Sequence, residues 1–159
     1  MRLAEREVKD INEIQRILTE AQVCRIALFD GSYPYIIPMC FGYDLDGDKL
    51  EIYLHSAAKG KKIDLIKANS HAAFEIDKLS RIVGGEAACS FTADYESITG
   101  AGSIDVISGI DKLTGLNLIM NKYDSGSKEH KYTEQMLNNV VILKLTADTF
   151  CCKAHVTAD

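Results

Sequence analysis

A cluster of cations follows a histidine and a serine in the stretch YLHSAAKGKKIDLI, residues 53–66. Its apolar spacing predicts a helix that begins near Ala57 or Ala58, with three lysines crowded into the first turn. These lysines are Lys59, Lys61 and Lys62. The helix dipole places positive charge at this end, so stacked cations are unfavourable there unless an anion neutralises them. The cluster therefore predicts an anion site, and backbone N–H groups, amines and a hydroxyl are groups that bind phosphate.

The spacing separates the three lysines into two groups. Lys59 and Lys62 are three residues apart and would share one helix face, whereas Lys61 would point elsewhere. Ser56 adds a hydroxyl, and Gly60 permits a close approach of the backbone. The alternative is a solvated helix face, which is what most charge runs form.

A second candidate is the apolar run IIPMC, residues 36–40, with Pro38 at its centre. A proline cannot donate to a strand ladder, so this strand belongs at a sheet edge or beside a ligand. Next to a phosphate site, it would offer an apolar wall and backbone groups to a flat ring. A plain edge strand is the alternative.

The remaining reactive residues form no recognisable set. The histidines His55, His71, His130 and His155 show no metal-ligand spacing, so no metal site is expected. Only His55 adjoins the predicted phosphate site, where it is either structural or a proton donor. The five cysteines lack C-x-x-C spacing, which argues against a zinc site and a disulfide framework. The TGAG run at residues 99–102 precedes a strand-like segment, so it does not predict dinucleotide binding.

The elements that would position these residues are mainly strands. Turn residues and period-two patterning predict a meander of three strands, then further strands and a loop over residues 78–88. We expect an N-terminal helix at about 10–22 capped by Asp10, a barrel core at about 24–107, a helix at about 109–123 and C-terminal strands at about 139–156. The meander strands are residues 24–30, 35–44 and 49–56, followed by 71–77 and 95–107. About six strands with few helices predict a mainly β fold, a small barrel with helices at its ends.

Length and charge narrow the class of protein. The 159 residues suit one domain, and 47% hydrophobic with 26% charged residues is an ordinary globular mix. A net charge of -5 argues against a nucleic-acid binder. No apolar run has the length of a membrane span or the features of a signal peptide, so no membrane partner and a cytoplasmic location are expected.

Three segments together resemble a known family: GSYPYIIPMCFGY, LEIYLHSAAKGKKIDLIKAN and ACSFTADYESITGAG. They are similar to the flavin-binding split barrels related to pyridoxamine 5′-phosphate oxidase, in particular to the nitroimidazole-resistance (Nim-type) branch. The resemblance covers roughly residues 25–123. It implies a six-stranded antiparallel split β-barrel and a homodimer that binds FMN, or alternatively FAD, at the subunit interface.

The resemblance also implies roles for individual residues. The phosphate-binding segment of the family corresponds to His55, Ser56, Lys59 and Lys62. The strand that lines the flavin ring corresponds to Ile37, Pro38, Met39 and Cys40. A further strand, expected from the other subunit, helps complete the site and carries Tyr95 and Ser97. Two basic residues of the oxidase correspond here to Ile37 and Gly42. Oxidation of pyridoxamine phosphate is therefore not expected.

The function implied is that of an FMN-dependent oxidoreductase. Its substrate would be small, flat and electron-poor, such as a nitroaromatic, with His55 as the proton donor. Two alternatives stay open. One is a flavin-binding carrier or sensor without turnover, and the other is a binder of another planar cofactor, such as haem or a deazaflavin.

Overall fold

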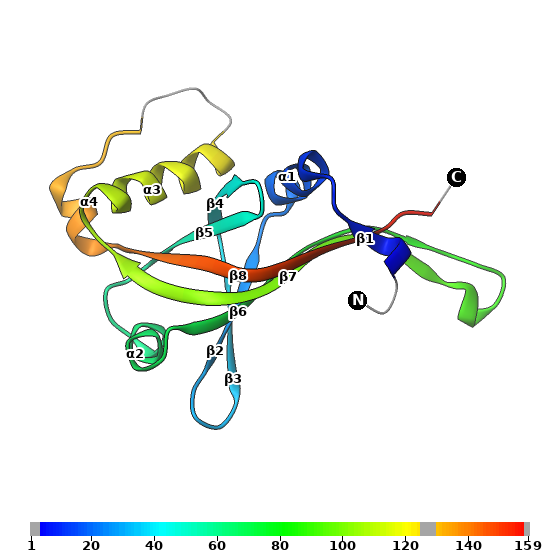
Figure 1. The fold of residues 1–159 in the computed structure, drawn as a ribbon, viewed down its shortest axis with the longest axis horizontal. Helices are drawn as coiled ribbons and strands as arrows, with labels where there is room; N and C mark the ends of the chain where they lie inside the picture. The colour runs from blue at the N-terminus through cyan, green and yellow to red at the C-terminus, as the bar shows by residue number, and fades with distance from the viewer. Residues whose placement is uncertain (1–3, 125–129, 158–159) are drawn as a thin grey trace.

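The structure is a computed structural model that describes residues 4–124 and 130–157 (Figure 1). Its strands are β1 (Glu7–Val8), β2 (Cys24–Phe29), β3 (Pro34–Met39), β4 (Phe41–Asp46), β5 (Lys49–Ser56), β6 (His71–Val83), β7 (Thr92–Ile107) and β8 (Val141–His155). Its helices are α1 (Ile11–Glu20), α2 (Lys61–Ala68), α3 (Gly109–Tyr123) and α4 (Glu134–Asn139), with short 3-10 turns at Ala4–Arg6 and Ala88–Ser90. None of the described helices is long and apolar enough to cross a membrane.

The strands form one antiparallel sheet in the order β3-β2-β6-β7-β8-β5-β4, and β1 pairs with β8. The two edge strands, β3 and β4, are consecutive in the chain and are separated only by Cys40. Because a single residue joins opposite edges, the sheet must curl until those edges approach each other. The predicted mainly β, antiparallel split-barrel fold is therefore confirmed.

The number of strands differs from the six that the sequence predicts, because the described residues form eight. The strand predicted over residues 35–44 breaks at Cys40, so its halves pair with β2 and β5 at opposite edges instead of continuing a meander. A two-residue strand, β1, adds the eighth. The loop predicted over 78–88 is shorter than expected, because β6 continues to Val83.

The helices follow the sequence signals more closely. The Asp10 side chain accepts a hydrogen bond from the Asn12 N–H at 2.8 Å, which confirms it as the cap of α1. The buried face of α1 includes Ile14, Ile17 and Leu18, which join the barrel core. Helix α3 has the predicted bounds, 109–123.

Two glycines permit close backbone approaches. A Cβ atom at Gly42 in β4 would lie 2.5 Å from the backbone of Leu118 and Ile119, so α3 packs directly on this strand. A basic side chain therefore has no room at this position. At Gly102, a Cβ would lie 2.0 Å from the Thr146 carbonyl oxygen, next to a register shift between β7 and β8. The TGAG run is thus a bend within a strand, as its glycines suggest.

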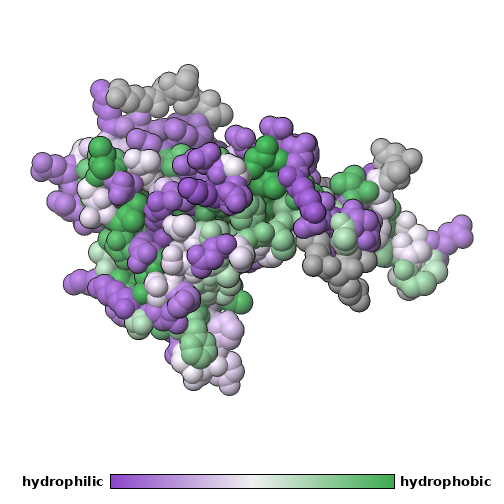
Figure 2. Space-filling view, viewed as in Figure 1, coloured by the Kyte–Doolittle hydropathy of each residue, from purple (hydrophilic) through white to green (hydrophobic). Residues whose placement is uncertain are grey.

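Strands β6, β7 and β8 extend beyond the barrel as an arm, which lies on the right in Figure 1. We define the arm as residues 79–97 together with residues 153–157. Helices α2, α3 and α4 gather at the other end of the sheet. Hydrophobic side chains reach the surface of the arm (Figure 2). The exposed apolar residues are Leu79 (59%), Ile82 (63%), Phe91 (58%) and Val156 (68%).

Candidate functional site

The first part of the candidate site is the N-terminus of α2. This helix begins at Lys61, with Gly60 as its N-cap, and not near Ala57 or Ala58 as predicted. Gly60 has a φ of 126°, a conformation that a helix cannot include, so the helix starts only after it. Lys59 consequently lies in the exposed turn before the helix and does not share a helix face with Lys62.

The N-terminus of α2 has no side-chain cap, because its N-cap residue is a glycine. The N–H groups of Ile63 and Asp64 both donate to the Gly60 carbonyl, at 2.9 and 3.2 Å. The two preceding amides, those of Lys61 and Lys62, belong to the first turn, whose N–H groups have no acceptor within the helix. An external anion can accept hydrogen bonds from them.

Lys61 is already neutralised. Its Nζ lies 2.9 Å from Asp30 Oδ2 and 4.7 Å from the centre of the Tyr35 ring. The Asp30 carboxylate also accepts N–H bonds from Tyr33 and Ser32. The Tyr33 amide, the Lys61 ammonium and the Ser32 amide together lower the pKa of Asp30 to about 2. Lys61 therefore ties α2 to the β2–β3 turn.

Lys62 has a different environment. Its Nζ contacts the thioether of Met39 on β3 at 3.6 Å. In the part of the chain that the structure describes, no carboxylate forms an ion pair with it. Lys62 is half-buried, and burial lowers its pKa. A desolvated cation beside uncapped amides is unfavourable alone, so this arrangement fits a bound anionic group such as a phosphate.

Strand β3 forms the neighbouring wall. It pairs only with β2, which confirms that Pro38 lies on an edge strand. Pro38 and Cys40 are exposed, whereas Ile37 packs against the core and Met39 is buried. The free side of this edge offers backbone N–H and C=O groups to a flat ring.

The end of β5 brings His55 and Ser56 to the same place. The β4–β5 ladder includes the pair Phe41 and Leu54, so Cys40 immediately precedes that pair and His55 immediately follows it. His55 is exposed. Ser56 is buried, and its hydroxyl donates to the Ala57 carbonyl at 3.0 Å. In this arrangement the Ser56 proton is engaged in the turn, although its oxygen can still accept a hydrogen bond.

Tyr95 and Ser97 lie in a different region, on the arm. Ser97 pairs with Asp77 and Lys153, whereas His55 pairs with Ile142, which in turn pairs with Ile107. Ten residues of β7 separate Ser97 from Ile107, or roughly 33 Å along the strand. Within one chain, Ser97 is therefore far from His55 along β7. Across the sheet, however, the adjacent residue Ile98 is in register with Met39 through Ile76 and Cys24, three strand spacings of roughly 4.8 Å each.

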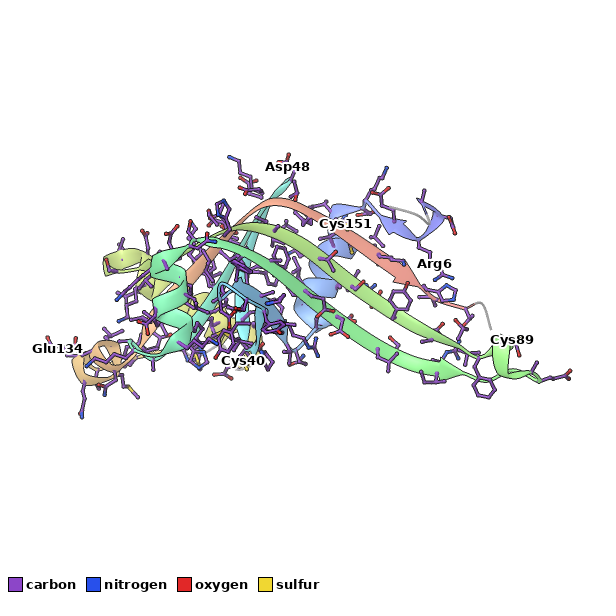
Figure 3. The ribbon with its side chains drawn as sticks, turned by 90° about the horizontal axis from the view of Figure 1, so that it is seen from below. Arg6, Cys40, Asp48, Cys89, Glu134 and Cys151 are labelled. Carbon is purple, nitrogen blue, oxygen red and sulfur yellow. The ribbon has the colours of Figure 1, made fainter. Side chains whose placement is uncertain are left out.

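The side-chain view supports this separation. The Tyr95 hydroxyl lies 3.5 Å from the guanidinium of Arg6. Figure 3 shows Arg6 and Cys89 toward the arm, well away from Cys40 at the barrel. The side chain of Tyr95, next to Arg6, therefore lies toward the arm.

A residue that the sequence did not indicate joins the site from α3. The Tyr123 hydroxyl accepts the Phe41 N–H at 3.1 Å and donates to the Gln22 carbonyl at 2.7 Å. Tyr123 lies 82 residues from Phe41, so no local pattern could have linked them.

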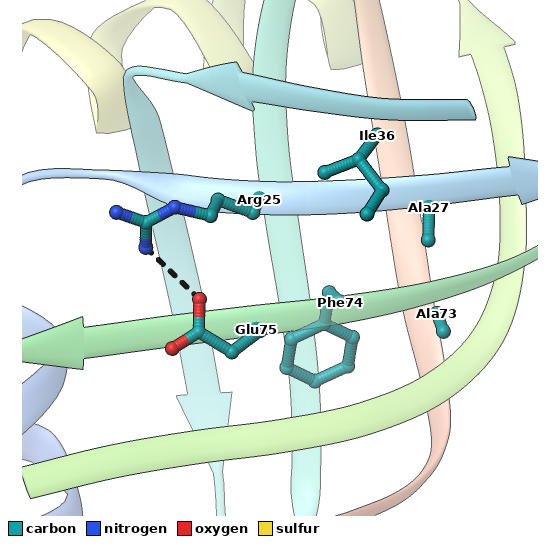
Figure 4. Close-up of a pocket in the computed structure, with 6 residues that line it drawn as sticks. All are labelled: Arg25, Ala27, Ile36, Ala73, Phe74 and Glu75. Carbon is teal, nitrogen blue, oxygen red and sulfur yellow. Dashed lines mark hydrogen bonds and ion pairs between the residues drawn. The ribbon is translucent and has the colours of Figure 1, made fainter. Parts of the chain in front are cut away.

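The outer face of β3, β2 and β6 carries a pocket of about 310 Å³ (Figure 4). It is lined by Arg25, Ala27, Ile36, Ala73, Phe74 and Glu75. Arg25 and Glu75 form an ion pair of 2.9 Å at one end. A second pocket, of about 230 Å³, shares the two alanines and ends at His71. The small side chains of both alanines make this face hollow, which the sequence analysis did not recognise.

Comparisons with known proteins agree with this fold. The model of the family described as pyridoxamine 5′-phosphate oxidase matches residues 10–153. Among solved structures, a Bacteroides thetaiotaomicron protein assigned provisionally to 5-nitroimidazole antibiotic resistance is 27% identical, with a TM-score of 0.77. The similarity covers 93% of this chain and 86% of that one.

Two further structures share the fold at lower identity. An FAD and haem binding protein from Mycobacterium smegmatis is 18% identical, with a TM-score of 0.81, and the match covers 96% of this chain and 74% of that one. A flavocytochrome from Azotobacter vinelandii is 16% identical, with a TM-score of 0.80, and the match covers 99% of this chain and 72% of that one. No curated protein sequence matches the chain.

Proposed function

Because the chain belongs to the pyridoxamine 5′-phosphate oxidase family, we propose that it is an FMN-dependent oxidoreductase that reduces a small, electron-poor substrate, such as a nitroaromatic. The observation that carries the proposal is the environment of Lys62, a half-buried cation beside uncapped helix amides and the edge of β3. The similarity to the Bacteroides protein supports the choice of substrate class.

The residues of the site fit the parts of FMN. Lys62 and the first amides of α2 would hold the phosphate, with Lys59 nearby in the exposed turn. The free edge of β3 from Ile37 to Met39, together with Cys40 after it, would lie along the flavin ring. FAD contains the same ring and a phosphate at the equivalent place, so it is the alternative flavin.

The chemistry divides between the cofactor and the chain. FMN, once bound and reduced by an external electron donor, would supply the electrons, and the protein would supply binding, orientation and proton transfer. His55 is exposed beside Cys40 at the edge of the ring wall, where its imidazole can donate a proton to a substrate. The apolar wall next to it would exclude water from one side of the ring.

The complete site would require a homodimer. Tyr95 and Ser97 lie too far along β7 to reach the α2 end of their own chain, and the arm exposes apolar residues such as Ile82 and Phe91. An arm that covers the partner's ring wall would bury this apolar surface and deliver Tyr95 and Ser97. No nucleic acid or membrane partner is proposed.

The direct test combines a spectrum with a turnover assay. The purified protein, titrated with FMN, should show a bound-flavin absorbance spectrum. Under oxygen-free conditions, the reduced holoprotein should then transfer electrons to a nitroimidazole. Tight flavin binding without transfer to any acceptor would instead indicate a carrier or sensor, and no flavin binding would reject the proposal.

A second candidate function, haem binding, has one specific observation in its favour. The His71 ring Nδ1 lies 2.9 Å from Asn69 Oδ1, which also accepts the His71 backbone N–H at 3.0 Å. This amide oxygen favours a proton on Nδ1, so Nε2 is left as a metal ligand beside the apolar pocket that contains Phe29. Haem titration should give a Soret band that His71→Ala abolishes and His155→Ala leaves intact. The same spectrum separates haem from flavin.

A further inference from the structure

The corner between β3 and β4 is held by a side chain from α3. Cys40 is the single residue between these strands, and the next N–H, that of Phe41, donates to the Tyr123 hydroxyl at 3.1 Å. The hydroxyl in turn donates a hydrogen bond to the Gln22 carbonyl at 2.7 Å, just beyond α1. One phenol therefore connects the barrel corner to the end of a helix.

The preceding residue strengthens this junction. The Lys122 ammonium donates to the carbonyls of Leu18 and Thr19, at 2.6 and 2.7 Å, at the C-terminal end of α1. It also lies 4.6 Å from the centre of the Phe41 ring. The last two residues of α3 thus fix α1 and Phe41 relative to each other.

The hydroxyl keeps its proton under ordinary conditions. Burial, together with the nearby Cys40 thiol, raises the pKa of Tyr123 to about 12. The phenol can therefore accept from Phe41 and donate to Gln22 at the same time, as the two distances require.

We propose that Tyr123 is a positioning residue, which fixes the corner at Cys40 and thereby the placement of the flavin ring against β3. The inference rests on the proposed function, because the ring must lie along this strand. Without the hydroxyl, the N–H of the buried residue Phe41 loses its acceptor, and the hydrogen-bonded connection between the corner and the end of α1 is lost. Loss of the hydroxyl should therefore weaken binding of the flavin ring and leave binding of the phosphate unchanged.

The test compares Tyr123→Phe with a matched control, Tyr43→Phe. The Tyr43 hydroxyl also bonds to α1, at Thr19 Oγ1 (2.7 Å) and the Gln15 carbonyl (3.3 Å), but it does not contact the corner. Tyr123→Phe should weaken FMN and riboflavin equally, by about 3- to 10-fold. It should also shift the midpoint potential and absorbance of the bound flavin, whereas Tyr43→Phe should change neither.

A flavin-independent measurement separates this inference from the proposed function. Cys40 is exposed, so its thiol can be labelled in apoprotein that carries Cys89→Ser and Cys151→Ser, which remove the other exposed cysteines of the described chain. Tyr123→Phe should speed labelling several-fold relative to Tyr43→Phe. Equal labelling rates, or flavin affinity and potential unchanged from wild type, would overturn the role of Tyr123 alone. A wild-type protein that binds no flavin would overturn the proposed function and the ring placement together.

Discussion

Lys62 Nζ lies 3.6 Å from Met39 Sδ, so the unneutralised cation of α2 contacts β3, the edge strand that precedes the barrel corner. Residues from two separate segments are brought together at this point. The cation faces the proposed phosphate, and the strand faces the proposed ring. The contact is the geometric basis for treating both segments as one flavin site.

Replacement of Lys62 by alanine should weaken FMN much more than riboflavin. The lost contact is charge-assisted and worth about 1.5–3 kcal/mol, or roughly 10- to 150-fold in the dissociation constant. Lys61→Ala is the matched control, because Lys61 is paired with Asp30 and should leave the FMN preference unchanged. Fluorescence titration measures both ligands. Equal losses for FMN and riboflavin in Lys62→Ala would remove the phosphate assignment.

Replacement of His55 by glutamine should keep the flavin and lower reductive turnover. Loss of a positioned proton donor commonly costs ~10²-fold in rate. His71→Gln, on the outer face of β6, provides a control that should retain wild-type turnover. Stopped-flow reoxidation by a nitroaromatic measures the step. A His55→Gln rate equal to that of wild type would return His55 to a structural role.

Flavin binding should be linked to dimerisation by mass action, because the ligand would bind only the complete site. On dilution, the apoprotein should dissociate at higher concentrations than the holoprotein, as sedimentation can show. Phe91→Asp, at an exposed apolar position of the arm, should raise the dissociation concentration of both forms. A monomer that binds FMN as tightly as the dimer would contradict the shared site.

The stability contributed by Lys122 should depend on pH. Burial lowers the pKa of its ammonium to about 8, from 10.5 when it is free. Between these values the unfolded chain binds more protons than the folded one, so this group makes the free energy of unfolding rise with pH. Below pH 8 it is charged in both states and contributes no slope.

The measurement is denaturant unfolding of wild type and Lys122→Met at several pH values from 7 to 10.5. Burial also raises the pKa of Cys24 to about 12. Above pH 9, this thiol therefore makes the free energy of unfolding fall as pH rises, the opposite of the effect of Lys122. Because Cys24 is present in both proteins, the difference between them isolates Lys122. The wild type should gain stability relative to Lys122→Met as pH rises, and a difference that is constant with pH would refute the assignment.

Alanine at Gly42 should destabilise the fold. Its Cβ would lie 2.5 Å from the α3 backbone, so the helix must move away from β4, at a cost of about 1–3 kcal/mol or more. Gly84→Ala is the control, because its Cβ would meet only the Phe91 side chain at 3.6 Å. Thermal unfolding should show a lower Tm for Gly42→Ala and little change for Gly84→Ala. Equal Tm values would mean that α3 does not pack there.

Local signals in the sequence determined several elements correctly. The cap at Asp10 depends on a side chain bonding to an amide two residues away, and the bounds of α3 follow from its own spacing. Pro38 indicated an edge strand because proline lacks the N–H that an interior strand needs. The preference for Lys62 over Lys61 as a phosphate ligand also came from spacing and stays a prediction, whereas the helix face predicted for Lys59 was wrong.

Only the tertiary structure decided that the strand breaks at Cys40 and that Ser97 lies far from His55 along β7. The same holds for the ion pair of Lys61 with Asp30 and for the hydrogen bond between Tyr123 and Phe41. Each depends on contacts between residues far apart in the chain, and these arise because the sheet curls until its two edges meet. Period-two patterning shows which residues face inward, but it does not show where a strand leaves one edge for the other. The sequence therefore indicated the chemical groups of the candidate site, and the curling of the sheet determined which of them one chain can bring together.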